Sequence, residues 1–327
     1  MSAKTMEPYG RALLDFFHGA LQPHQDQDRK PGRGPFSMKN QDVYLRSIRS
    51  AYPDLDIASA GFNAQGQNSD VVVVNDEFIF RFPKYAHVIE DLRTETAILE
   101  AVRGRVPLPV PDPIFVCLER PVGQAFAAYC LIPGEPLWWD TFRAIENREV
   151  VRRLADQVAG FLRALHSIPV DSLGIELPLH DTYAEGVDIY ARIREKLFGL
   201  MRPDARAWAT QHFEGFLARA SNFAGEPVLK HGDFGPSNIL FDNGRQRVSG
   251  IIDFGGSGLG DPAYDFAGLL SGYGEGFVEQ CARAYPEVEG FMGRIRFYRG
   301  AFALLEALFG IENGDQDALR AGLAQYV

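Results

Sequence analysis

Three polar residues in one stretch of the chain have the types and the spacing that phosphoryl transfer requires. Asp233 follows His231 by two positions, Asn238 lies five residues further on, and Asp253 lies fifteen residues after that. An aspartate can accept the proton of an attacking hydroxyl group, whereas amide and carboxylate oxygens are hard ligands that suit Mg²⁺. The pattern therefore predicts Asp233 as the catalytic base and Asn238 with Asp253 as magnesium ligands.

The residues between Asn238 and Asp253 predict a hairpin that would bring both side chains to one end. Residues 239–241 are a short apolar strand, residues 242–244 (Asp-Asn-Gly) are a turn signal, and residues 247–252 return as a second strand. Each polar residue alone could be an ordinary turn residue. The three together, at this spacing and with a hairpin between them, favour the catalytic interpretation.

The sequence resembles the aminoglycoside phosphotransferase family, which comprises kinase-like enzymes that phosphorylate small molecules. The matching residues are His231-Gly232-Asp233, Asn238, Ile252-Asp253-Phe254-Gly255 and Gly260-Asp261-Pro262 with Asp265. A protein kinase would carry arginine at position 232 and a longer activation segment before position 261. Residues 78–84 and 132–137 are most similar to the branch that acts on the 2″-hydroxyl group of aminoglycosides. The resemblance covers roughly residues 41–327.

The resemblance implies an α+β, two-lobed, protein-kinase-like fold. A small N-lobe, with an antiparallel sheet, one key helix and a hinge, would span residues 41–133. A larger, mainly helical C-lobe with the catalytic loop and the substrate site would span residues 134–327. Residues 1–40 would form an N-terminal extension with a short apolar helix in residues 1–20. The polar, Pro- and Gly-rich composition of residues 21–37 predicts a flexible tether there.

Hydrophobic periodicity predicts the individual elements of both lobes. In the first lobe we expect helices over residues 41–51 and about 88–102, and strands over residues 71–74, 77–82, 114–118 and 124–132. In the second lobe we expect helices over residues 150–165, 189–200, 207–220, 277–284 and 294–309. The aromatic residues of the last helix are expected in the core.

The resemblance also assigns residues that would bind the nucleotide phosphates. Arg81 stands where the family carries its phosphate-pairing lysine, and Glu95 resembles the helix glutamate that orients this cation. Lys84, three residues later, is the alternative. Arginine keeps the charge of lysine but binds phosphate through a planar fork of donors. Gly66 and Ser69 lie in the stretch before the strand that starts at residue 71. The backbone N–H groups of this stretch could lie over the nucleotide phosphates. An ordinary turn is the other interpretation.

Three further groups of residues complete the predicted site. Backbone groups near Cys130 and Ile132, in the hinge, would contact the nucleobase. Asp261 is expected to cap the helix that follows it, because aspartate is a strong N-cap residue, and Asp265 is expected to support the catalytic loop. His166, at the end of an apolar helix, is expected to be structural.

The implied reaction is Mg²⁺-dependent transfer of the γ-phosphate of ATP or GTP to a hydroxyl group of a small molecule. An aminoglycoside is the leading acceptor. A polycationic acceptor needs carboxylates, and Glu275 and Glu279 are the candidates. Gly256 stands directly after Asp-Phe-Gly, where similar enzymes usually carry an acid. A macrolide or a metabolite alcohol is the alternative acceptor. A nucleotide-binding protein without transferase activity is the alternative function, and the intact catalytic residues argue against it.

The composition of the chain argues against several classes of protein. The 327 residues carry a net charge of −10, which argues against general nucleic-acid binding, and 46% of them are hydrophobic, enough for a buried core. No apolar run of eighteen residues and no signal-peptide pattern is present, and the three cysteines form neither a disulfide framework nor a zinc motif. We expect a cytoplasmic enzyme that binds no membrane and exists as a monomer or a weak dimer.

Overall fold

The computed structural model describes residues 38–63, 68–177 and 181–327. Its described residues divide into two compact units, and the chain passes between them after Arg103, Leu108 and Pro133. We call residues 38–103 and 109–133 the sheet unit, and residues 104–108 and 134–327 the helical unit. The predictions made for residues 1–37 and for Gly66 lie outside the described residues.

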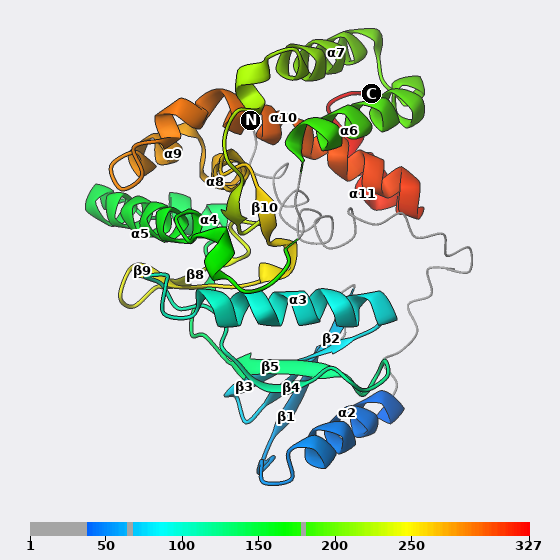
Figure 1. The fold of residues 1–327 in the computed structure, drawn as a ribbon, viewed down its shortest axis with the longest axis vertical. Helices are drawn as coiled ribbons and strands as arrows, with labels where there is room; N and C mark the ends of the chain where they lie inside the picture. The colour runs from blue at the N-terminus through cyan, green and yellow to red at the C-terminus, as the bar shows by residue number, and fades with distance from the viewer. Residues whose placement is uncertain (1–37, 64–67, 178–180) are drawn as a thin grey trace. The chain divides into compact units, whose positions relative to one another are not determined.

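The sheet unit is a five-stranded antiparallel sheet with one helix on each face (Figure 1). The strand order is β1-β2-β3-β5-β4. The strands are β1 Ala60–Asn63, β2 Ser69–Val74, β3 Phe78–Pro83, β4 Pro113–Cys117 and β5 Phe126–Cys130, and the helices are α2 Met38–Ala51 and α3 Ala86–Val102. Most bounds lie within two residues of those predicted, and β1 is an additional strand.

The two faces of the sheet differ because side chains alternate along each strand. In β3, Phe80 and Phe82 are fully buried and pack in one cluster with Tyr44 and Ile48 of α2. Arg81 lies between them in the sequence and therefore points to the opposite face, where α3 packs. The apolar cluster fixes the strand register and so fixes the side from which Arg81 projects.

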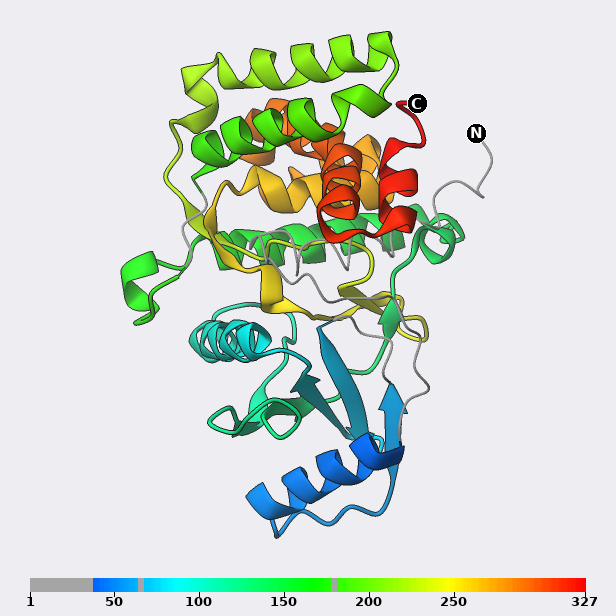
Figure 2. The same ribbon diagram turned by 90° about the vertical axis from the view of Figure 1, so that its right-hand side faces the viewer.

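The helical unit contains eight α-helices within its described residues (Figure 2). They are α4 Trp139–Arg143, α5 Arg148–His166, α6 Thr182–Lys196, α7 Pro203–Leu217, α8 Ala263–Tyr273, α9 Glu275–Cys281, α10 Val288–Asn313 and α11 Gln316–Leu323. The helix α10 contacts α6, α7, α8, α9 and α11. Its apolar residues are consequently buried on several sides, which is typical of a central helix.

Short strands within the helical unit position the loops between them. The hairpin of β8 Ile239–Asp242 and β9 Arg247–Ile251 carries β6 Glu135–Pro136 at its outer edge, and β7 Val228–Lys230 pairs with β10 Gly258–Gly260. Short 3₁₀ turns occupy Val170–Ser172, Phe198–Leu200, Ala220–Phe223 and Phe254–Gly256. The predicted loop–hairpin–loop arrangement is confirmed by the antiparallel pairing of β8 with β9.

Three of the predicted helices start four or more residues earlier than expected. One is α10, expected over residues 294–309, which starts at Val288. Local signals explain the other two. The helix expected over residues 189–200 is α6, which spans Thr182–Lys196 because Asp181 caps it by accepting hydrogen bonds from the backbone N–H groups of Tyr183 and Ala184. The helix expected over residues 207–220 is α7, which starts at Pro203, a favoured first helical residue. Hydrophobic spacing finds the middle of a helix, whereas the caps determine its ends.

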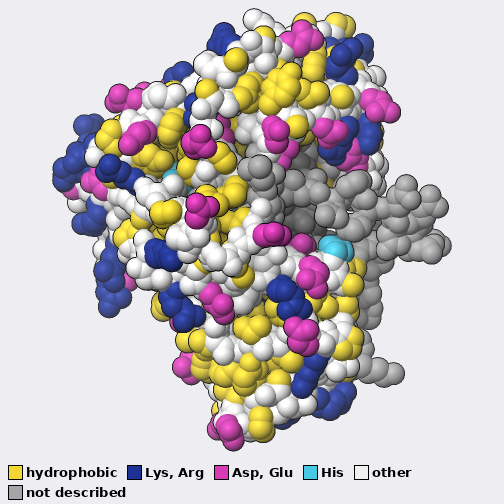
Figure 3. Space-filling view, viewed as in Figure 1, with side chains coloured by type: hydrophobic (Ala, Val, Ile, Leu, Met, Phe, Trp, Pro, Cys, Tyr) yellow, Lys and Arg dark blue, Asp and Glu magenta, His cyan; other side chains and the backbone are white. Residues whose placement is uncertain are grey.

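The surface shown in Figure 3 mixes acidic, basic and hydrophobic side chains across most of its area. Among the described helices, none has the length together with the apolarity that a membrane crossing requires.

Candidate active site

One buried carboxylate fixes the start of the loop that follows β7. The backbone N–H groups of His231 and Gly232 donate to Asp265 Oδ2 and Oδ1, each at 2.8 Å. The ring nitrogen Nε2 of His166 lies 3.0 Å from the same Oδ2. Burial alone would raise the pKa of Asp265, but the hydrogen bond with His166 and nearby positive charges lower it overall. These contacts agree with the supporting roles predicted for Asp265 and His166.

The conformation of the loop requires glycine at position 232. The φ angle of Gly232 is +84°, and a Cβ atom there would lie 1.9 Å from the backbone oxygen of Gly256. Any other residue would therefore push apart the two segments that carry Asp233 and Asp253.

The side chain of Asn238 holds Asp233 in place. Asn238 Nδ2 donates to the backbone oxygen of Asp233 at 2.9 Å and to its carboxylate Oδ2 at 2.8 Å. Both residues are buried, with exposed fractions of 6% for Asp233 and 1% for Asn238. Because the amide nitrogen points to Asp233, the amide oxygen Oδ1 points away from it and can serve another partner.

Asp253 lies at the same end of the hairpin as Asn238. Ile239 pairs with Ile251 in the hairpin, and Ile252 N donates to Asn238 O at 3.0 Å. Asp253 follows directly in a left-handed conformation with φ 67° and ψ 75°, which aspartate tolerates better than most residues. Asn238 and Asp253, which are fifteen positions apart in the sequence, therefore lie on either side of the same hairpin.

The oxygens of Asn238 and Asp253 fit a magnesium ion. One amide oxygen and one carboxylate are hard donors, and Mg²⁺ in phosphate-binding sites usually takes few protein ligands and completes its shell with phosphate and water oxygens. The described residues hold no group of three or more His, Cys, Asp or Glu side chains that could bind a metal without such help.

Asp261 joins the beginning of α8 to α10. Its Oδ1 accepts a hydrogen bond from Ala263 N at 2.9 Å, which agrees with the predicted capping role, although Pro262 is the residue in the N-cap position. Its Oδ2 accepts from Arg294 Nε at 2.8 Å and from the Tyr298 hydroxyl group at 2.9 Å. The segment after Asp253 is thus anchored to the central helix.

In the sheet unit, Arg81 forms an ion pair with Glu95 of α3. Arg81 Nη1 lies 2.7 Å and 2.8 Å from the two carboxylate oxygens of Glu95, whose side chain is 3% exposed. Lys84 instead pairs with Asp70, at 3.1 Å. The cation that Glu95 orients is therefore Arg81, and the alternative, Lys84, has a carboxylate of its own.

The other residues that were predicted to contact the nucleotide differ in their burial and hydrogen bonding. Ser69 begins β2 and is buried, and its hydroxyl oxygen has no hydrogen-bond partner among the described residues. Cys130 ends β5 and is exposed, and Ile132 is half-buried. Between them, Leu131 N donates to Glu77 O at 2.7 Å, so this hinge donor already has a partner within the sheet unit.

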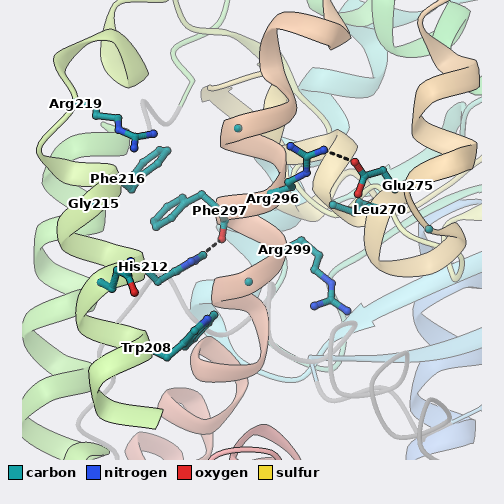
Figure 4. A pocket seen from close by; sticks show the side chains of 14 residues that line it. Trp208, His212, Gly215, Phe216, Arg219, Leu270, Glu275, Arg296, Phe297 and Arg299 are labelled. Atoms are coloured by element: carbon teal, nitrogen blue, oxygen red, sulfur yellow. Dashed lines mark hydrogen bonds and ion pairs between the residues drawn. The ribbon is translucent and has the colours of Figure 1, made fainter. Parts of the chain in front are cut away.

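Glu275 lies on the side of α8 that faces away from the catalytic loop. On α8, Gly268 contacts the backbone of Phe234, whereas Leu270, about half a turn away, lines a pocket of about 730 Å³ together with Glu275 (Figure 4). In this pocket Glu275 is paired with Arg296.

The lining of this pocket does not suit a cationic acceptor. It carries the arginines Arg219, Arg296 and Arg299 and includes one acid, Glu275. Glu279 is exposed on α9, and its charge acts on Arg296. Both predicted acceptor carboxylates thus act on Arg296, and their role in binding the acceptor stays a prediction.

Sequence reasoning missed two residues that lie beside the catalytic loop, Lys230 and Tyr264. The Lys230 ammonium lies 4.9 Å from the ring centroid of Tyr264, and the carboxylate of Asp233 contributes to raising the pKa of that tyrosine, after the larger effect of burial. The available signal was a lysine at the end of the apolar run Val228-Leu229, three positions before the predicted base.

Known proteins are similar to this chain over most of its length. A model of the phosphotransferase enzyme family, APH, matches residues 60–301. Viomycin phosphotransferase of Streptomyces vinaceus is 28% identical over 266 residues, which are 78% of this chain and 88% of the relative. An aminoglycoside 3′-phosphotransferase of Escherichia coli is 26% identical over 233 residues, 67% of this chain and 77% of the relative.

A solved structure extends the likeness to three dimensions. The complex of APH(2″)-IIIa with GDP and kanamycin has a TM-score of 0.78 and 26% identity, and the match covers 86% of this chain and 95% of that one. The predicted α+β, kinase-like fold is thereby confirmed. Because the family model matches well over half of its residues, the chain belongs to the phosphotransferase enzyme family and is a kinase-like phosphotransferase with an alcohol group as acceptor.

Proposed function

We propose that this phosphotransferase transfers the γ-phosphoryl group of ATP or GTP, with Mg²⁺, to a hydroxyl group of an antibiotic, with an aminoglycoside as the leading acceptor class. The observation that carries the proposal is the carboxylate of Asp233, which Asn238 orients at 2.8 Å in a loop that Asp265 fixes. The relatives named for viomycin and aminoglycosides support the acceptor class, and the GDP complex supports a nucleotide donor.

Asp233 acts as the base in this proposal. A hydroxyl group of the acceptor donates a hydrogen bond to the carboxylate and passes its proton to it as the bond to phosphorus forms. The hydrogen bond from Asn238 fixes the rotation of the carboxylate, so that the acceptor meets an oriented group and little reorganisation is needed in the transition state.

Asn238 and Asp253 hold the metal that accompanies the nucleotide. When bound there, Mg²⁺ neutralises charge on the phosphate oxygens. Asn238 connects the two parts of the reaction, because its nitrogen orients the base while its oxygen is available to the metal. In the sheet unit, Arg81 binds nucleotide phosphate oxygens, and Glu95 keeps the guanidinium group oriented.

The second candidate acceptor is an antibiotic of another class or a metabolite alcohol. Two observations favour it. The viomycin-named relative matches a larger share of this chain than the aminoglycoside-named relative, 78% against 67%. In addition, Glu275, one of the two acids expected to bind a polycation, lies on the other side of α8 from the catalytic loop and is paired with Arg296.

The test is acceptor-dependent release of nucleoside diphosphate by the purified protein, with ATP and GTP in separate reactions containing Mg²⁺. The acceptors are aminoglycosides, viomycin, macrolides and simple alcohols. We expect Asp233→Asn to lower kcat by about 10²–10⁴-fold, the usual contribution of a general base, with nucleotide affinity unchanged in calorimetry. Asp242→Asn, at the opposite end of the same hairpin, is the matched control and should keep turnover.

The outcomes separate the alternatives. Turnover of an aminoglycoside supports the leading class, and turnover of another compound alone moves the acceptor to the second candidate. Nucleotide binding without turnover of any acceptor would make the chain a binding protein and contradict the proposal. Equal turnover by Asp233→Asn and the unaltered protein would remove Asp233 from its proposed role.

A further inference from the structure

Lys230 is a buried cation three residues before the proposed base. It is the last residue of β7, and its exposed fraction is 6%. Its partner across the β7–β10 ladder is Gly258, which has no side chain to fill the space opposite. Among the residues that the structure describes, no atom accepts a hydrogen bond from Lys230 Nζ, which rests over the ring of Tyr264 at 4.9 Å from its centroid.

The surroundings of Lys230 connect it to Asp233. Burial raises the pKa of Tyr264 most strongly, and the charges of Asp233, Glu185 and Asp265 raise it further. Burial also lowers the pKa of Lys230, against the attraction of Asp265 and Glu185. Lys230 Nζ also lies close to Gly232, because a Cβ atom at that glycine would lie 3.2 Å from it. The ammonium therefore lies beside the residue directly before Asp233, so a group that reaches Asp233 also approaches Lys230.

The hydrogen bonds that hold the start of the catalytic loop do not involve this ammonium. Asp265, the nearby buried acid, already accepts hydrogen bonds from the backbone of His231 and Gly232 and contacts His166. Burying an ammonium without a hydrogen-bond acceptor is unfavourable, and the ring of Tyr264 compensates for only part of that cost. Such a cost is common at functional sites, where a side chain is kept for a bound molecule.

We propose that Lys230 is a specificity-determining residue that donates a hydrogen bond to an oxygen of the acceptor, next to the hydroxyl group that Asp233 receives. The preferred acceptor thus presents a hydroxyl, carbonyl or carboxylate oxygen at that position, and an ammonium group there is rejected by like-charge repulsion. This inference rests on the proposed function, because it takes Asp233 as the residue that meets the acceptor. It deepens that function by defining one feature of the substrate class.

The first test needs no acceptor. Lys230→Met keeps the length of the side chain and removes the charge, so the melting temperature of the free protein should rise by about 2–6 °C. Lys196→Met is the matched control, because Lys196 on α6 pairs with Glu312 at 2.6 Å, and its loss should not raise the melting temperature. A lower melting temperature for Lys230→Met would show a structural role and overturn the proposal.

The second test measures selectivity. It uses pairs of acceptors that differ at one position, hydroxyl against amine, so that the pairs together cover each position of the molecule. The unaltered protein should prefer the hydroxyl member of at least one pair by about 10-fold or more in kcat/KM, and Lys230→Met should reduce that ratio to near one. Lys230→Arg, which keeps the charge, should retain a preference, and nucleotide affinity should stay unchanged in all variants.

The outcomes distinguish this inference from the proposed function. An unchanged ratio in Lys230→Met, or an equal loss for both members of every pair, would overturn the role of Lys230 while phosphoryl transfer stands. Absence of turnover for every acceptor in the unaltered protein would contradict the proposed function. In that case the melting temperature of Lys230→Met alone decides whether the ammonium is structural.

Discussion

Arg81 in the sheet unit and Lys230 in the helical unit are both largely buried cations on short strands, but their surroundings are opposite. Arg81 is held by both oxygens of Glu95, at 2.7 Å and 2.8 Å. Lys230 rests on the ring of Tyr264, and no hydrogen-bond acceptor for it lies among the described residues. A paired guanidinium is oriented before any ligand arrives, whereas an ammonium without an acceptor gains its partner from the ligand.

The difference follows the chemistry that we propose for the two sites. Triphosphate oxygens are the same in every reaction cycle, so a fixed, preformed donor suits them. Acceptors vary, and a single flexible ammonium can bind whichever oxygen is presented to it. Burial of a charge therefore does not by itself indicate its role, because the partners decide whether the group supports the fold or binds the ligand.

The strongest effect is expected when Arg81, the paired cation of this comparison, loses the carboxylate of Glu95. Glu95→Ala leaves a buried guanidinium without this carboxylate, so we expect a loss of about 2–4 kcal/mol in the free energy of unfolding, measured in urea. Glu100→Ala removes an exposed acid from the same helix and should change the stability by less than about 0.5 kcal/mol. Equal stability of the two variants would show that the Arg81–Glu95 pair contributes nothing to the fold.

Glu306 on α10 is a buried carboxyl group that can be compared with these two cations. It is 4% exposed, and its Oε1 has no hydrogen-bond partner among the described residues. Burial, and then the charge of Asp315, raise its pKa from 4.5 to about 7. The folded state therefore keeps the proton that the unfolded state loses, and this advantage is complete below pH 4.5 and lost as the pH rises to about 7.

Removing this ionisation should change how stability depends on pH. At pH 8, Glu306→Gln should be more stable than the unaltered protein, by at most about 3 kcal/mol, the free energy that corresponds to this pKa shift. The gain should shrink as the pH falls from 7 towards 4.5. Melting temperatures across this range measure it, with the exposed Glu289→Gln on the same helix as control. A gain independent of pH would contradict the raised pKa of Glu306.

The smallest expected effect tests the geometry of the paired cation. Arg81→Lys keeps the charge but removes the guanidinium fork, so we expect a loss of about 1 kcal/mol in stability and weaker nucleotide binding in calorimetry. Arg93→Lys, on a half-exposed arginine of α3 that pairs with Glu90 and Glu119, should leave nucleotide affinity unchanged. Unchanged nucleotide affinity in Arg81→Lys would mean that charge alone is sufficient at this position.

The sequence predicted those features that depend on local spacing. The hairpin between Asn238 and Asp253, the antiparallel sheet and the central helices all follow from alternation, turn residues and three-to-four spacing. The pairing of Arg81 with Glu95 agrees with the resemblance, although the two residues are fourteen positions apart. The roles proposed for these residues stay predictions until the variants are measured.

Other features depend on contacts between distant segments, which spacing does not show. Lys230 and Tyr264 meet because β7 and α8 pack against the same loop, and Glu275 is separated from Asp233 because α8 lies between them in the fold. The starts of α6 and α7 were missed because Asp181 and Pro203 are weak signals beside a hydrophobic pattern. Tertiary packing decides these positions, and a single sequence contains little record of it.

The bonds that Asp265 makes to the catalytic loop go to backbone N–H groups of His231 and Gly232, not to side chains. A main-chain attachment of this kind does not depend on which residue precedes the loop, because every residue except proline carries the same N–H group. The position now occupied by Lys230 can therefore change in evolution without disturbing the geometry of Asp233. A lineage of such enzymes could acquire new acceptors by exchanging that one residue while its transfer chemistry is inherited intact.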